Sequence, residues 1–299
     1  MTKKCPQAST GAWILSTQAR GLNEPMSRIL SVVVFSVMLI SVTDASAFDH
    51  AVWDRLLRQH VVPQRGGVTT AVNYRGLQED RALLTQYLAS LGAVDKASFE
   101  TWPAAERLAF LINTYNAWTV ELILTAYPQL ESIKDLGSFF SSPWKRDIVQ
   151  LFGEKISLDD IEHGMIREQG EYDEPRIHFA VNCASIGCPA LRNEAYTGER
   201  LEMQLTEQAE SFLADRTRNR FADGRLEVSS IFKWYRDDFE RGWRGYRSLA
   251  GFIAQYGQQI GLSVEDAQRL RRGEIDISFL AYDWRLNSLA GEQIRWIEQ

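Results

Sequence analysis

Residues 104–127 read AAERLAFLINTYNAWTVELILTAY, and this stretch predicts a long helix that is buried on most of its faces. Apolar residues recur around the helix, Pro103 suits its first turn, and Pro128 ends it. Two amides, Asn113 and Asn116, interrupt the apolar run. Because a buried amide costs stability unless it is paired, we expect both either to brace a neighbouring loop or to line a pocket.

The pattern on either side of this helix predicts a mixed architecture. Apolar residues at helical spacing predict helices at residues 51–60, 77–91, 157–167, 199–214, 249–256 and 264–271, and one that begins near residue 230. Extended segments are expected at residues 148–152 and 155–157 as a hairpin, and at residues 177–182, 226–228 and 276–286. These elements alternate without a βαβ period or a repeat. The sequence therefore predicts an α+β fold in a single domain, mostly helical with a small, mainly antiparallel sheet.

The composition is that of an ordinary globular protein. Of 299 residues, 45% are hydrophobic and 24% are charged. Acidic residues (39) outnumber basic ones (33), which gives a formal net charge of −6. No basic stripe is present, so we expect no nucleic-acid partner.

The N-terminal residues predict export. A short basic start at residues 26–28 and an apolar run at residues 29–42 precede the small-residue cleavage pattern Ala45-Ser46-Ala47. The apolar run is shorter than the roughly 20 residues that span a bilayer, which favours a cleaved signal at residues 26–47 over an anchor. Residues 1–25 look like an over-extended start. We expect a periplasmic or secreted domain of residues 48–299, with no transmembrane segment after cleavage.

Residues 176–189, RIHFAVNCASIGCP, carry the chemistry. Cys183 and Cys188 lie here with His178, and His163 follows Glu162 upstream. A thiol needs a neighbouring base or cation to become a thiolate at neutral pH. A catalytic thiol, a structural Cys183–Cys188 disulfide and a simple buried cysteine all stay open. The spacing matches no common zinc module, so we expect neither a metal nor a cofactor.

Four segments in the same order resemble a known family. They are FLINTYNA at residues 110–117, LDDIEH at 158–163, HFAVNC at 178–183 and YDWRLN at 282–287. Together they resemble the domain-of-unknown-function family 547, in the form of an exported bacterial member. The resemblance spans most of residues 50–290, is densest over 105–195, and brings no established reaction. It implies a role for the residues of the signature segments: Asn113, Tyr115, Asn116, Glu162, His163, His178 and Cys183.

The choice of a base for Cys183 depends on geometry. His178 and Cys183 are five residues apart, so on a strand their side chains would point to opposite faces. His163 lies on a separate helix and can approach from elsewhere, so it is the preferred base and His178 the second choice. No histidine follows His178, so a dyad requires an arrangement unlike that of papain-like enzymes.

The expected site is a pocket around Cys183, which would act as the nucleophile. Glu162 is a candidate acid, Asn116 would polarise a substrate carbonyl, and Asp283 would orient the base. Asn113 and Tyr115 are expected to support the pocket. The chemistry that thiolates perform well predicts hydrolysis or acyl transfer on an amide, with a small molecule or a peptide as the ligand. The alternative is a non-catalytic binding or scaffold domain pinned by the Cys183–Cys188 disulfide. The sequence decides neither between these two nor the oligomeric state.

Overall fold

A computed structural model describes residues 48–137 and 142–289, which all lie within the unit Ala45–Gln299. The signal expected at residues 26–47 and the over-extended start at residues 1–25 lie outside the described residues.

Within those two ranges, no helix is both long enough and apolar enough to cross a membrane.

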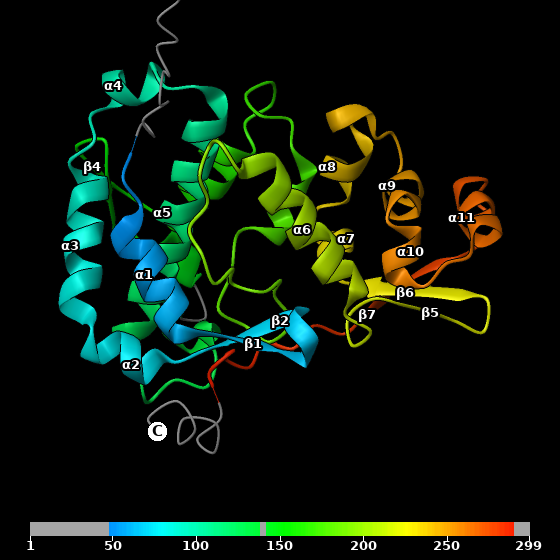
Figure 1. Ribbon diagram of the computed structural model, residues 1–299, viewed down its shortest axis with the longest axis horizontal. Helices are drawn as coiled ribbons and strands as arrows, with labels where there is room; N and C mark the ends of the chain where they lie inside the picture. Colours follow the sequence, from blue (N-terminus) through cyan, green and yellow to red (C-terminus); the bar gives the residue numbers. More distant parts are fainter. Residues whose placement is uncertain (1–47, 138–141, 290–299) are drawn as a thin grey trace, which may run out of the picture. The chain divides into compact units, whose positions relative to one another are not determined.

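A first hydrophobic core surrounds the long central helix. Helix α5 (Ala104–Leu124) buries most of its side chains, as its sequence predicts. Around it lie α1 (Ala51–His60), α2 (Tyr74–Glu79), α3 (Arg81–Gly92) and α4 (Lys96–Glu100), as Figure 1 shows.

Two antiparallel hairpins flank this core. The first joins β1 (Val61–Gln64) to β2 (Thr69–Val72) through the short turn η1 (Arg65–Gly67), and the second joins β3 (Val149–Leu151) to β4 (Glu154–Ile156). The second hairpin turns at Gly153, whose φ of 81° favours glycine. It confirms the hairpin predicted at this position.

A second core is built from the C-terminal half. Its helices are α6 (Leu201–Ala214), α7 (Ile231–Trp234), α8 (Arg236–Glu240), η6 (Trp243–Gly245), α9 (Leu249–Gln255), α10 (Gly257–Ile260) and α11 (Val264–Arg271). A three-stranded sheet pairs β5 (Arg220–Ala222) antiparallel with β6 (Arg225–Ser229), and β6 parallel with β7 (Ile277–Leu280). The two cores and their small sheets confirm the mostly helical α+β fold class.

The chain between the two cores is irregular, and here the predicted strand at residues 177–182 is wrong. The segment forms a short 3-10 helix, η5 (Pro175–Phe179). Arg176 is buried because it pairs with Glu174 at 2.6 Å and with Glu202 at 2.8 Å, and these ion pairs stabilise a helical turn. Other short helices in this region are η2 (Ile133–Leu136), η3 (Pro143–Lys145) and the π-helix η4 (Asp160–Ile166).

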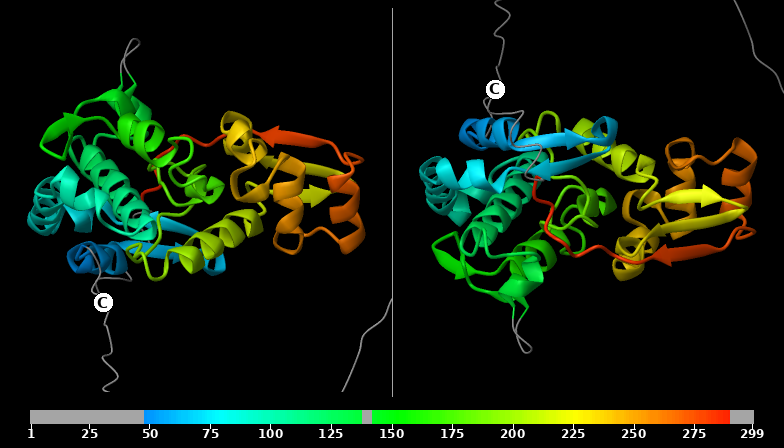
Figure 2. Two further views of the ribbon diagram at one scale, coloured as in Figure 1. Left: turned by 90° about the horizontal axis from the view of Figure 1, so that it is seen from above. Right: turned by 90° about the horizontal axis from the view of Figure 1, so that it is seen from below.

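The C-terminal segment returns from the second core to the first. The strand expected at residues 276–286 ends at Leu280, and the chain then runs back irregularly beside the first core (Figure 2). Leu286 forms an antiparallel bridge with Ser185, and Ser288 forms a parallel bridge with Val72. This segment, residues 281–289, therefore contacts the loop that carries the cysteines.

Candidate functional site

The cysteines lie on a turn that α5 holds in place through asparagine side chains. Asn116 accepts a hydrogen bond from the backbone N–H of Asn182 at 2.8 Å and donates to the carbonyl of Ala180 at 2.9 Å. Asn182 in turn accepts from the N–H of Ala184 at 2.9 Å and donates to the carbonyl of Pro189 at 2.7 Å. The side-chain oxygen and nitrogen of Asn116 both hydrogen-bond to backbone, so Asn116 is not placed to polarise a substrate carbonyl as expected.

Asn113 has the same bracing role one helical turn earlier. Its amide donates to the carbonyl of Tyr196 at 2.8 Å and accepts from the Tyr196 N–H at 3.0 Å. The two asparagines therefore pair with loops that pack on α5, and neither lines the pocket described next.

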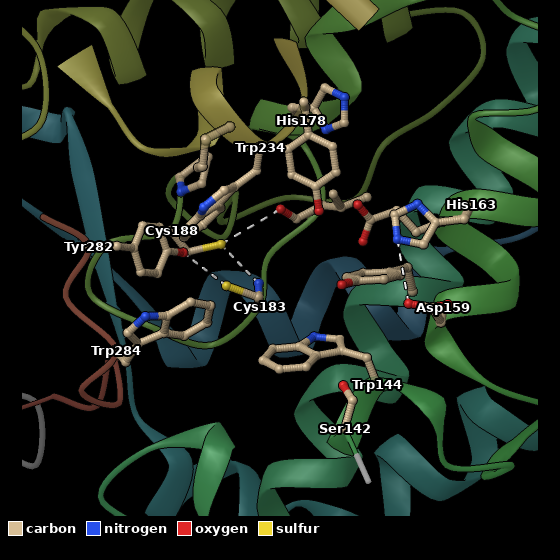
Figure 3. A pocket seen from close by; sticks show the side chains of 16 residues that line it. Ser142, Trp144, Asp159, His163, His178, Cys183, Cys188, Trp234, Tyr282 and Trp284 are labelled. Atoms are coloured by element: carbon tan, nitrogen blue, oxygen red, sulfur yellow. Dashed lines mark hydrogen bonds and ion pairs between the residues drawn. The ribbon is translucent and has the colours of Figure 1, made fainter. Parts of the chain in front are cut away.

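A cavity of about 200 Å³ opens beside the cysteine turn. It brings together residues from α5, η3, η4, η5, α7 and the C-terminal segment, and Figure 3 shows their side chains. The lining residues are Tyr115, Ser142, Trp144, Asp159, Glu162, His163, His178, Val181, Cys183, Cys188, Pro189, Ile231, Trp234, Tyr235, Tyr282 and Trp284. Five of the expected site residues therefore share one pocket with Cys188, while Asn113, Asn116 and Asp283 lie outside it.

Cys183 is surrounded by hydrogen-bonding groups. Its Sγ lies 3.1 Å from the Oγ of Ser185 and 3.1 Å from the hydroxyl of Tyr282, and its own N–H donates to the Sγ of Cys188 at 2.9 Å. The hydrogen bond from the Cys188 thiol, aided by the two hydroxyls, outweighs burial and lowers the pKa of Cys183 to about 7. A large fraction of this thiol is therefore thiolate at neutral pH.

Cys188 is the protonated member of the pair. Burial, together with the neighbouring Cys183 sulfur, raises the pKa of Cys188 well above its ordinary value. Both cysteines are free thiols in the structure.

His178 is paired with an acid that no sequence motif marks. Its Nε2 lies 2.8 Å from Asp238, a fully buried carboxylate that also binds Arg167 at 2.6 Å and Arg241 at 2.9 Å. Burial opposes the ionisation of Asp238, but the bonds from His178 and Arg167 outweigh it and lower its pKa to about 2. Burial lowers the pKa of His178 against the opposing influence of Asp238. His178 is thus a neutral imidazole with its Nε2 proton directed to Asp238.

The π-helix η4 presents Glu162 and His163 to the pocket. π-helices are rare and often occur at functional sites. Arg167 donates to the Nδ1 of His163, so the neutral ring carries its proton on Nε2, which lies 3.4 Å from Asp159. Glu162 is buried, and its Oε1 has no hydrogen-bond partner among the described residues.

The expected contact between Cys183 and a histidine is not formed. Both histidines lie across the pocket from Cys183 (Figure 3), and within residues 48–137 and 142–289 the side-chain partners of its sulfur are the hydroxyls of Ser185 and Tyr282 and the Cys188 thiol. His178 lies on the 3-10 helix η5, and the strand expected to turn its side chain away from Cys183 is not formed. Asp283 binds Arg285 at 2.5 Å instead of orienting a base, and Asp238 holds His178 in its place.

No group of three or more histidine, cysteine, aspartate or glutamate side chains in the described part of the chain is placed to hold a metal ion.

The comparison with protein families matches the segment that carries this turn. Residues 99–213 match the family described as "Protein of unknown function, DUF547". This segment belongs to the DUF547 family. The chain has no match among curated proteins and none among solved structures.

The DUF547 segment supplies only one side of the pocket. It includes α5, η4, η5 and the cysteine turn, whereas Trp234, Asp238, Tyr282 and Trp284 lie beyond it. Sequence reasoning missed Asp238, Ser185 and the aromatic side of the pocket. For Tyr282 a signal existed, since it opens the segment YDWRLN.

Gly187 sets how closely the C-terminal segment approaches the cysteine turn. A Cβ at Gly187 would lie 2.9 Å from the backbone nitrogen of Asp283 and 3.0 Å from the Tyr282 ring. We expect Gly187→Ala to displace Tyr282 from Cys183 and so to raise the pKa of the thiol, measured as slower alkylation at pH 7. Gly164→Ala is the control, because a Cβ there meets nothing within 4 Å. Equal alkylation rates in the two variants would contradict this account.

Proposed function

We propose that this DUF547 protein is a thiol-dependent hydrolase or acyltransferase that acts on an amide substrate. The observation that carries the proposal is the Cys183 thiol, which faces an accessible cavity with a pKa lowered to about 7. A thiolate that forms through hydrogen bonds needs no histidine in contact with it. This removes the objection raised by the missing Cys–His contact.

The residues across the pocket fit the remaining proton transfers. The Cys183 thiolate would attack the carbonyl carbon, forming a C–S bond, and the C–N bond would break as the amine takes a proton from a water molecule in the cavity. The hydroxide left behind would then attack the thioester, or take the proton of an acceptor amine that attacks it, and the thiolate would be released. His163 would hold that water through the proton on its Nε2, on the side of the ring opposite Arg167.

The pH dependence of alkylation tests the thiolate. We expect iodoacetamide to label Cys183 with a midpoint near pH 7, read from the peptide masses, because the cited hydrogen bonds stabilise the anion. Cys188→Ser should remain folded and reactive at Cys183. Tyr282→Phe should raise the midpoint by about one pH unit, since a hydrogen bond to a charged group contributes roughly 1.5–3 kcal/mol. A midpoint at or above about 8.5, the ordinary value for a thiol, would exclude the proposed nucleophile.

The binding or scaffold domain with a Cys183–Cys188 disulfide is the second candidate. It is supported by the placement of both cysteines in one turn, where the Sγ of Cys188 lies 2.9 Å from the nitrogen of Cys183. In that case neither cysteine labels before reduction, one peptide carries both, and Cys188→Ser lowers the unfolding temperature.

We also propose that the protein is exported, on the strength of residues 26–47. The intact mass of protein recovered from the periplasm should then correspond to a chain that begins at Phe48. Retention of residues 26–47 would contradict this.

A further inference from the structure

Aromatic side chains make up a large part of the lining of this cavity. The six aromatic lining residues are Tyr115, Trp144, Trp234, Tyr235, Tyr282 and Trp284. Trp284 lies 5.6 Å from Trp234 and 4.5 Å from Tyr282, measured between ring centroids, and Trp234 is 48% exposed. Their proximity in the pocket is seen in Figure 3 for the labelled Trp234, Tyr282 and Trp284. A half-exposed tryptophan beside a cavity leaves a ring available to a ligand.

Rings of this group already bind cations elsewhere on their surfaces. The Nζ of Lys134 lies 3.6 Å from the centroid of the Trp284 ring, and the guanidinium of Arg167 lies 4.9 Å from that of Tyr235. Both distances are within the roughly 6 Å over which a ring attracts a cation. Neither cation is among the residues that line the cavity.

A carboxylate oxygen in the same cavity lacks a donor. Glu162 is only 6% exposed, and its Oε1 has no partner within the described ranges. Leaving a buried carboxylate oxygen unpaired is costly, so a bound group that donates a hydrogen bond would be strongly favoured. Arg167 does not donate to this oxygen in the structure, and its Nε and Nη1 hydrogen bonds go to Asp238 and His163.

The charge of the lining excludes an anionic ligand. Asp159, Glu162 and the Cys183 thiolate face the cavity, and no lysine or arginine of the described chain lines it. We propose that the substrate carries an ammonium group, which lies against the Trp234 and Trp284 rings and donates to the free Oε1 of Glu162. This names the substrate class for the proposed thiol chemistry and rests on that function.

Charged thiol reagents test the inference without a known substrate. Cys183 would be modified with three methanethiosulfonates that carry an aminoethyl, a methyl or a sulfonatoethyl group, all at one pH. In each case the thiolate attacks the sulfenyl sulfur, a disulfide forms, and methanesulfinate leaves with the electron pair. Rates at Cys183 are read from peptide masses and divided by the rates for free cysteine.

We expect the normalised rate with the aminoethyl reagent to exceed that with the sulfonatoethyl reagent at least tenfold. Glu162→Gln should lower this ratio about fivefold, which corresponds to roughly 1 kcal/mol for one nearby charge. Glu168→Gln, exposed on the same stretch of chain, removes an equal charge and should leave the ratio unchanged. Trp234→Leu is the second variant, because this exposed ring can be removed without opening the core, and it should lower the aminoethyl rate alone.

The outcomes separate this inference from the proposed function. Rapid modification at equal normalised rates for all three reagents would overturn the ammonium group and leave the thiolate intact. Equal changes of the aminoethyl-to-sulfonatoethyl rate ratio in Glu162→Gln and Glu168→Gln would also overturn the ammonium group and leave the thiolate intact. Failure of all three reagents to modify Cys183 would overturn the thiol function itself.

Discussion

Replacing Asp238 with alanine is expected to lower the free energy of unfolding by about 3–5 kcal/mol, because a buried charge cluster would lose the carboxylate that pairs its members. The fully buried carboxylate holds His178 at 2.8 Å, Arg167 at 2.6 Å and Arg241 at 2.9 Å. Removing it leaves the partly buried Arg167 cation without its carboxylate partner and the buried His178 ring without its hydrogen-bond acceptor. For a chain of this size the unfolding temperature should fall by roughly 10 °C, measured by calorimetry.

The same variant has a defined pH dependence. The pKa of Asp238 falls from 3.8 to about 2 in the folded protein, so the carboxylate stabilises the fold fully above pH 3.8. This contribution is lost as the pH falls through about 2. The difference in the free energy of unfolding between the native protein and Asp238→Ala should therefore decrease between pH 3.8 and about 2. Asp237→Ala, at the exposed neighbouring position, is the control. Equal unfolding temperatures for the two variants would show that the charge cluster contributes little.

Asn116→Ala is expected to destabilise the protein by about 2–4 kcal/mol and to loosen the cysteine turn. The Ala180 carbonyl and the Asn182 N–H would both lose their partner, and each unsatisfied buried group costs about 1–3 kcal/mol. Asn182 positions the N–H of Ala184, a non-glycine residue with a φ of 60° next to Cys183. We therefore expect the alkylation midpoint of Cys183 to rise as well.

Leu108→Ala separates the two effects of the asparagine. Leu108 is buried on the same helix, and its truncation should cost a similar 2–5 kcal/mol without touching the turn. Under native conditions the pH midpoint for alkylation of Cys183 in the Leu108→Ala variant should stay near 7. If both variants change the midpoint equally, global instability and not the Asn116 brace controls the thiol.

The elements with strong local signals could be predicted from the sequence. Helix α5 follows from a long apolar stretch bounded by Pro103 and Pro128, and the β3–β4 hairpin follows from alternation around Gly153. The short apolar run at residues 177–182 predicted a strand where the chain forms a helical turn, because periodicity cannot separate a short buried strand from a helical segment. The deciding factor was the burial of Arg176 by Glu174 and Glu202, and the second of these is far along the chain.

The site divides in the same way. One pocket is lined by Cys183, His163, His178 and Glu162. These residues could be selected from the sequence because cysteine and histidine are rare in it and because all four lie in the signature segments. Asp238 stands beside Asp237, and nothing in the sequence says which of the two turns inward to His178. Tyr282 opens the segment YDWRLN, but its contact with Cys183 depends on the return of the C-terminal segment, which local residue patterns do not show.

Because that segment returns to the first core, the pocket is built from two parts of the chain that are distant in sequence. Residues 99–213 hold the thiol and the acid–base groups, whereas Trp234, Tyr282 and Trp284 come from beyond them. An expression fragment trimmed to the matched residues would thus keep the nucleophile and lose four of the six aromatic lining residues. Homologous chains that retain the first part and diverge in the second should share a chemistry while selecting different ligands, and exchanging residues 214–289 between them should transfer the preference.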